Sequence, residues 1–293
     1  MIDKEKSDGI MRVIDLLGCI PLLKFSSDCA RESMENKERR QLDVLRGRIE
    51  RVFPVADPEA CNYSDSPAQR MIDNINREKS LPPETIPGED GPELADSEED
   101  RLAYLDILHA TAIVFMWSTV ETILRETLPY MCVLEKPGAK LDDKEMLFDQ
   151  EFRDGQGRYN FRMDKFEDYY KQTIGPFNGI RNCEQIKDIL GLNNMFKHCD
   201  SIYDEEAIHK KGGRCLSGNI KNELWPKPSQ EYIKWRRYLK KERGLSFKKE
   251  QQLNIPYRNL DIANQMRYCN EFANDILGKI EQKLQAHNLI ACR

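Results

Sequence analysis

One stretch decides the fold: residues 102–128 read LAYLDILHATAIVFMWSTVETILRETL. Its apolar side chains recur at spacings of three and four residues, and neither glycine nor proline interrupts it before Pro129. Ser97 and the acidic residues 98–100 supply an N-cap and a negative first turn, which suit the positive end of a helix dipole. The sequence therefore predicts a long helix over 102–128. Because its middle is apolar almost all round, we expect this helix at the buried centre of the fold.

Further helices are predicted on both sides of this stretch. The last one, over 260–287, presents a face that includes Met266, Phe272 and Ile276. No segment shows the sustained alternation of apolar and polar residues that is typical of strands. We therefore expect a mainly α fold, a helical bundle with long irregular loops. The other predicted helices cover 10–17, 28–53, 68–77, 144–152, 164–174 and 181–190, the last of which continues or restarts after Gly191.

The composition divides the chain into three parts. Residues 1–55 form a predicted N-terminal helical extension. Seven prolines lie between 54 and 98 among frequent acidic residues, so residues 56–98 are predicted to be a proline-rich acidic linker. Within it, Ser80–Pro92 is expected to be an exposed, mobile loop. Residues 99–293 hold the predicted helical bundle.

Charge and size exclude some classes of function. The chain of 293 residues carries 45 basic and 50 acidic side chains, a formal net charge of −5. Such a protein is not a polycation that coats nucleic acid, so any anion must bind to a local basic patch. The apolar fraction of 40% suffices for a core, and the charged fraction of 32% predicts a large solvated surface.

Nothing in the sequence indicates secretion or a membrane. The uncharged run Ile107–Val120 is shorter than the roughly 20 apolar residues that a spanning helix needs. The N-terminal residues lack the apolar core of a signal peptide. The nine cysteines are scattered without the two-residue spacing of a zinc or redox motif. We expect a cytoplasmic protein with reduced thiols and no membrane partner.

The sequence also lacks the usual signatures of cofactor sites. The glycine-rich phosphate loops and the serine nucleophile elbow do not occur. His198, Cys199 and Asp200 are neighbours that point in different directions from a helix, so they do not share one ion. His198 and His209 are separated by a loop and could converge, but no further cysteine or histidine at ligand spacing completes a tetrahedral site. We expect neither a metal nor another cofactor.

One local pattern suggests chemistry: residues 189–204 read ILGLNNMFKHCDSIYD. Asn194 and His198 are four residues apart, so they share one face of the helix that ends there. Histidine titrates near neutral pH and can move protons in catalysis. A histidine at this place can also bond the free carbonyls of the helix end and gain from the helix dipole. Both interpretations of His198 stay open.

This pattern, together with the apolar helix that contains Glu121, resembles the HEPN superfamily over residues 100–290. Members are helical-bundle domains common in prokaryotic defence and toxin–antitoxin systems. Active members cleave RNA without a metal: a ribose 2′-hydroxyl attacks the phosphate, histidine moves a proton, and arginine steadies the added charge. The resemblance implies a catalytic site at His198, Asn194 and Asn193. Asn193 stands where the family has arginine, so the cationic clamp is missing.

The resemblance implies two alternative functions. The first is an RNA-directed component of a bacterial defence or toxin-type system, a metal-independent endoribonuclease if His198 is active. The second is a non-catalytic HEPN-like module that binds nucleic acid or docks a partner. A homodimer is also implied, because the family builds its RNA cleft from two copies of the motif helix. A protein partner from the same defence or toxin–antitoxin system is implied too. For Glu121, an ion pair with Arg125 is the more ordinary role.

A second region suits nucleic acid. Residues 232–249 interleave basic side chains with rings such as Tyr232 and Trp235. Cations contact phosphates and rings stack on bases in single-strand binding, although a helix with buried rings and solvated charges gives the same pattern. Lys197 and Arg214 complete the predicted nucleic-acid contacts. The basic residues predicted from this run are Lys234, Arg236, Arg237, Lys240 and Lys241.

Overall fold

The fold is a mainly helical bundle, as the sequence predicts. It was obtained as a computed structural model. The structure describes residues 37–53, 67–81, 85–88, 91–94, 98–159, 161–198, 202–203, 216–226 and 253–290. Within these ranges, two short antiparallel pairs are the only strands.

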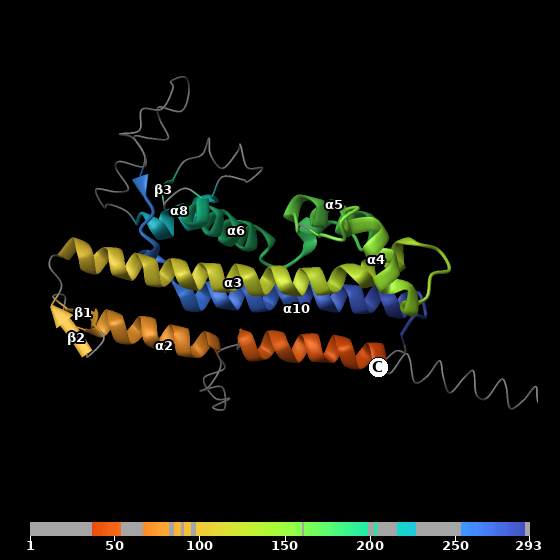
Figure 1. Cartoon of the computed structure of the whole chain (residues 1–293), viewed down its shortest axis with the longest axis horizontal. Coiled ribbons are helices and arrows are strands. Elements are labelled where there is room, and N and C mark those ends of the chain that lie inside the picture. Colours follow the sequence, from red (N-terminus) through yellow and green to blue (C-terminus); the bar gives the residue numbers. More distant parts are fainter. Residues whose placement is uncertain are drawn as a thin grey trace, which may run out of the picture.

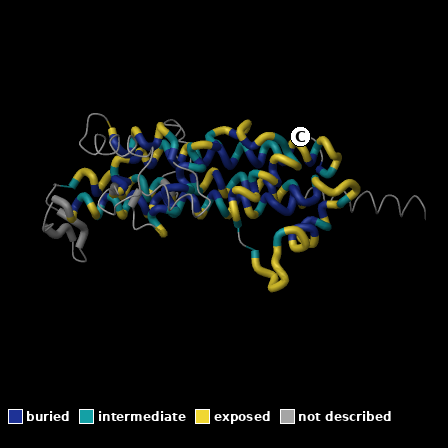
Figure 2. Tube along the Cα trace, turned by 90° about the horizontal axis from the view of Figure 1, so that it is seen from above, coloured by how far each residue is buried: buried dark blue, intermediate teal, exposed yellow. Residues whose placement is uncertain are grey.

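Two long helices form the middle of the bundle. Helix α3 (Glu98–Glu135) runs along the whole molecule beside the last helix, α10 (Ile262–Ala286) (Figure 1). The helix over 37–52 and helix α2 (Pro67–Ser80) lie nearly end to end on one side of this pair. Figure 2 shows buried residues along the full length of the bundle, between exposed outer faces. The helices on the opposite side are α4 (Lys144–Phe152), α5 (Met163–Thr173) and α6 (Cys183–His198).

Helix α3 is longer than the sequence indicates. We predicted its end at Leu128, before Pro129, but the helix continues to Glu135. A proline inside a helix removes one backbone hydrogen bond and costs about 3 kcal/mol relative to alanine. Burial offsets this cost, because the next four side chains are at most 3% exposed. These four side chains are Tyr130, Met131, Cys132 and Val133.

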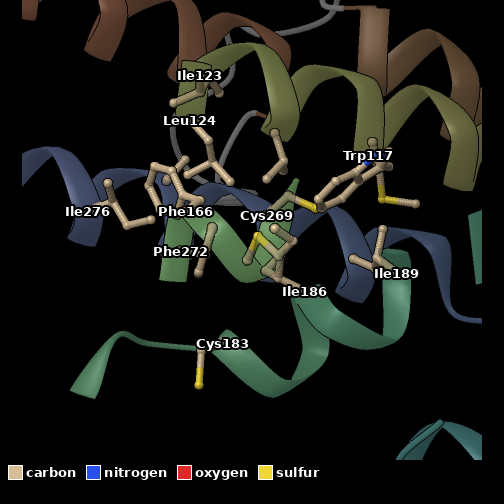
Figure 3. Close-up of a cluster of buried hydrophobic side chains, with 14 of the residues drawn as sticks. Trp117, Ile123, Leu124, Phe166, Cys183, Ile186, Ile189, Cys269, Phe272 and Ile276 are labelled. Atoms are coloured by element: carbon tan, nitrogen blue, oxygen red, sulfur yellow. The ribbon is translucent and has the colours of Figure 1, made fainter. Parts of the chain in front are cut away.

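One hydrophobic cluster joins the layers of the bundle. Figure 3 shows side chains from α3, α5, α6 and α10 meeting in it, among them Leu124, Phe166, Ile186 and Phe272. Cys269 of α10 lies within the cluster, and its complete burial raises the pKa of its thiol. Each large apolar side chain buried in this way contributes about 1.5–3 kcal/mol. Packing between the helices is therefore the main stabilising contribution.

The helix over 37–52 belongs to the same cluster. Its side of the cluster consists of Leu42, Leu45, Ile49 and Phe53. The amide of Asn270 on α10 donates a short hydrogen bond to the Phe53 carbonyl, which fixes the end of this helix against α10. The predicted boundary at residue 55 thus lies between two segments that pack on the same long helices. As a division into domains it stays a prediction, and the predicted helix over 10–17 lies outside the described residues.

The stretch that we predicted to be a linker holds regular structure. Helix α2 covers the short helix predicted there, and the buried guanidinium of Arg101 on α3 donates to the Glu78 carbonyl at 2.5 Å. Strands β1 (Thr85–Gly88) and β2 (Gly91–Leu94) then pair antiparallel, where the sequence predicted a loop. Each strand has four residues, too few for an alternating pattern to register in the sequence.

Short elements complete the fold around α6. Strand β3 (Ile202–Tyr203) pairs antiparallel with β4 (Leu253–Asn254), so two segments far apart in the sequence lie side by side. The basic run over 232–249 lies between these two strands in the sequence, outside the described residues. The remaining elements are helix α8 (Gly218–Leu224) and the 3₁₀ turns η1 (Leu141–Asp143), η2 (Phe177–Gly179) and η4 (Tyr257–Asn259).

Helix α3 also has the length and composition of a membrane-spanning helix. The qualifying part is Asp100–Glu135, and half of its most apolar 18-residue window is buried inside the bundle. The uncharged run over 107–120, from which we predicted no spanning helix, ends before the apolar turns that follow Pro129. Helices at the centre of a bundle that are apolar nearly all round have the same properties.

Candidate functional site

The predicted catalytic residues lie on α6, whose periodicity decides which side chains face the bundle. Ile186, Ile189, Leu192 and Met195 are fully buried and pack towards α3 and α10. The Tyr257 hydroxyl of η4 donates to the Leu192 carbonyl at 2.9 Å, a contact inside the bundle. The helix runs through Gly191 without a break. The orientation of α6, and hence of its polar residues, is fixed by this packing.

Asn193, which the resemblance predicts to stand in place of an arginine, points into the bundle. Its side chain is only 2% exposed. Its amide nitrogen lies 3.4 Å from the Asn194 side-chain oxygen, and its own oxygen has no hydrogen-bond partner in the part of the chain that the structure describes. An unpaired buried carbonyl costs about 1–3 kcal/mol. Asn193 is therefore a destabilising polar group in the core and offers no cation to a substrate.

His198 lies on the outside, at the last residue of α6. Its ring is exposed, as is the side chain of Lys197, while Asn194 is half-buried one turn earlier. The structure thus keeps Asn194 and His198 on neighbouring turns, while Asn193 is buried beside Asn194. No hydrogen bond or ion pair joins His198 to any arginine among the described residues.

The other predicted contacts cannot be placed beside this motif. Arg214 and the basic run lie outside the described residues, and so do the possible ligands Cys199, Asp200 and His209. Where the structure describes the chain, no three side chains of histidine, cysteine, aspartate or glutamate gather around a common point that could hold a metal ion. The residues of this prediction outside the described ranges are Arg214, Lys234, Arg236, Arg237, Lys240 and Lys241.

Asp188 on α6 has a structural role that the sequence analysis missed. It is nearly buried and accepts hydrogen bonds from the Ser217 backbone at 2.7 Å and from the Ser217 hydroxyl at 2.5 Å. Desolvation raises the pKa of its carboxyl despite these bonds. Ser217 also caps α8, accepting from the Ile220 amide at 3.4 Å. This contact holds α8 against α6.

Glu121 takes the ordinary role that we predicted. Its carboxylate pairs with the Arg125 guanidinium at 2.5 Å, four residues along α3. Arg125 also lines a large hollow that was not predicted from the sequence.

A large hollow opens between the helix over 37–52, α3 and α4, at the right-hand end of the bundle in Figure 1. Its volume is about 1220 Å³. Six of its lining residues are cations and two are carboxylates; we call it the basic hollow. The cations are Lys37, Arg40, Arg48, Arg125, Lys144 and Arg153, and the carboxylates are Glu126 and Glu145.

The floor of the basic hollow is a polar network. Lys144 forms a short ion pair with Glu38 and donates to the Gln41 side-chain oxygen at 2.8 Å. The Tyr130 hydroxyl lies 3.2 Å from both Glu38 and Gln41. Burial, and then the Glu38 charge, raise the Tyr130 pKa, so the hydroxyl stays protonated. This network joins the helix over 37–52 to α3 and α4.

One sequence signal could have revealed this hollow. Lys37, Arg40, Gln41, Val44 and Arg48 recur at spacings of three and four residues along one helix, and all five line the hollow. Such a stripe of cations on one helix face is visible before the structure is known.

Comparison with protein families, with curated proteins and with solved structures finds no match for this chain.

Proposed function

We propose that the protein is an RNA-directed, HEPN-like component of a bacterial defence or toxin-type system that binds RNA without cleaving it at the α6 motif. The observation that supports the non-cleaving form is the burial of Asn193. Metal-independent cleavage through a 2′-hydroxyl needs a group that moves a proton and a positive group beside the phosphate. His198 is available for the first task, but Asn193 cannot perform the second.

The size of this deficit favours binding over catalysis. Removing one donor that stabilises a developing oxyanion lowers the rate by about 10²–10³. Lys197 does not replace the missing cation, because it is adjacent to His198 and neighbouring side chains on a helix point in different directions. The RNA-directed part of the proposal is supported by the family resemblance. The homodimer and a protein partner from the same system belong to this proposal too.

A cleavage assay with matched histidine variants tests the proposal. We expect purified full-length protein to bind labelled single-stranded or structured RNA in EDTA and to leave it intact. His198→Ala should bind RNA as the wild type does, and so should His287→Ala, which removes the exposed histidine at the end of α10. Cleavage that leaves 2′,3′-cyclic phosphate ends, and that only His198→Ala abolishes, would establish the endoribonuclease instead.

Light scattering tests the homodimer separately. The chain has a mass of 34.2 kDa, so a dimer should scatter as a particle of twice that mass at micromolar concentration. A strict monomer would remove the composite cleft from the proposal.

A further inference from the structure

We propose that the basic hollow holds a single-stranded segment of RNA. This inference rests on the proposed RNA binding and deepens it, because it puts the strand on a surface formed by the helix over 37–52, α3 and α4, whereas the resemblance points to α6.

The charge of the hollow fits a phosphate backbone. Its lining has six cations against two carboxylates. One of the two carboxylates, Glu126, is already paired with Arg48 at 2.6 Å. Lys37 and Arg40 are exposed and pair with no carboxylate among the described residues. These two side chains can therefore neutralise phosphates without first breaking an ion pair within the described structure.

Three further cations are held from outside the hollow. Arg125 pairs with Glu121 and Arg153 pairs with Asp149, each at 2.5 Å, while Lys144 pairs with the buried Glu38. None of these three carboxylates lines the hollow. The ion pairs fix the directions of the cations, which lowers the entropy that a bound ligand would otherwise have to remove.

The rings of the hollow favour a ligand with flat bases. The Arg125 guanidinium lies over the Tyr159 ring, 5.5 Å from its centroid, and the Arg153 guanidinium lies over Phe148 at 5.9 Å. RNA bases stack on aromatic rings and on guanidinium planes alike. An acidic peptide would satisfy the charges, but its carboxylate side chains carry no ring system to pack on these rings and guanidinium groups. The combination therefore favours a nucleic-acid strand over an acidic protein segment.

The size of the hollow favours a strand over a single nucleotide. Pockets for small molecules usually enclose about 300–1,000 Å³ and bury most of the ligand. The basic hollow exceeds this range at about 1220 Å³. Its cations come from three helices and the segment after α4.

The salt dependence of RNA binding tests this inference. We would measure fluorescence anisotropy of a labelled oligouridine with the full chain between 50 and 300 mM salt. The variant Lys37→Gln/Arg40→Gln removes the two cations of the hollow that pair with no carboxylate among the described residues. The matched control, Lys165→Gln/Lys171→Gln, removes two exposed cations of α5 outside it. The slope of log affinity against log salt is negative, and each lost phosphate contact reduces its magnitude by about 0.7 for a single strand. The slope of the hollow variant should therefore be about 1.4 less steep than that of the wild type.

Each outcome has a definite meaning. A less steep slope and weaker binding in the hollow variant alone support the inference. Equal slopes in the two double variants overturn it while leaving RNA binding, and hence the proposed function, intact. No RNA binding by the wild type overturns both.

Two competition arms identify other occupants. Polyglutamate that binds the wild type but not the hollow variant, in the absence of RNA binding, would assign the hollow to an acidic protein partner. Full displacement of the oligonucleotide by stoichiometric uridine monophosphate would replace the strand by a single nucleotide. Both results overturn the inference. Photocrosslinking of a thiouridine oligonucleotide to the Tyr159 segment would support it without any substitution.

Discussion

Replacing Asn193 by leucine should stabilise the protein. The Asn193 side chain lies in the core, and its oxygen has no hydrogen-bond partner among the described residues. Leucine has the same branching at the same distance from the backbone, so it fills the site with methyl groups and removes the polar atoms. The residues around it, such as Ile189 and Leu192, are fully buried and apolar.

The magnitude follows from two opposing contributions. An unsatisfied buried polar group costs about 1–3 kcal/mol, which the substitution recovers. The hydrogen bond to Asn194 is lost, but at 3.4 Å it exceeds the usual 2.7–3.2 Å and is worth less than about 1 kcal/mol. Asn194 is half-buried, so water can replace its donor. The net gain should be about 1–2 kcal/mol, which raises Tm by about 2–5 °C in a domain of this size.

Urea denaturation followed by circular dichroism, together with calorimetry, measures this gain. The contrasting variant is Asn193→Arg, which would bury an unpaired charge and should cost about 3–5 kcal/mol. Leucine that destabilises the protein by more than about 1 kcal/mol would refute the reasoning, because the Asn193 oxygen would then have a partner that stabilises it. RNA cleavage gained in Asn193→Arg would likewise refute it, since that variant would then present its cation to a substrate.

Two further predictions concern buried charges and titration. Lys144→Met leaves Glu38 buried without its cation and should lower the free energy of unfolding, measured in urea, by about 3–5 kcal/mol. The double variant Lys144→Met/Glu38→Leu should recover most of that loss. Equal stability of the wild type and the single variant would contradict the buried pair. Burial lowers the pKa of His109 to about 4, so the unfolded chain binds a proton first, and the free energy of unfolding should fall by up to about 3 kcal/mol as the pH drops from 6.5 towards 4. His109→Gln should reduce this loss in denaturation curves at pH 4.5 and 7.5. The same loss in that variant would assign the titration to another group.

The sequence was sufficient for the long helices because their apolar faces repeat over many turns. The helix predicted over 260–287 is found as α10, and the one predicted over 144–152 is found with the same ends as α4. Asp261 accepts from the Asn264 amide at 3.1 Å and caps α10, a local contact that a sequence pattern can indicate. Repetition and local capping are the two kinds of information that a single sequence carries well.

Tertiary packing decided the elements that the sequence analysis missed. The continuation of α3 through Pro129 depends on burial of the following turn, which local preference opposes. Helix α2 itself was predicted, but its contact with α3 was not: it depends on Arg101, which follows its partners Glu78 and Leu81 by 23 and 20 residues. The basic hollow draws its cations from three helices and the segment that follows α4, so no single segment displays more than part of it.

The face that α6 turns to the core could have been predicted from the sequence, and it bears directly on function. Asn193 follows Ile186 by seven residues and Ile189 by four, so ideal helix geometry puts all three on one face. The structure buries all three. The four-residue spacing from Asn194 to His198 predicts a shared outer face, while the spacing of Asn193 from Ile186 and Ile189 predicts that Asn193 lies in the core. A helix that buries this position can keep its histidine on the surface and still lack the charge that phosphate cleavage requires. Six cations are instead gathered at another surface, in the basic hollow, where we propose that the RNA strand binds.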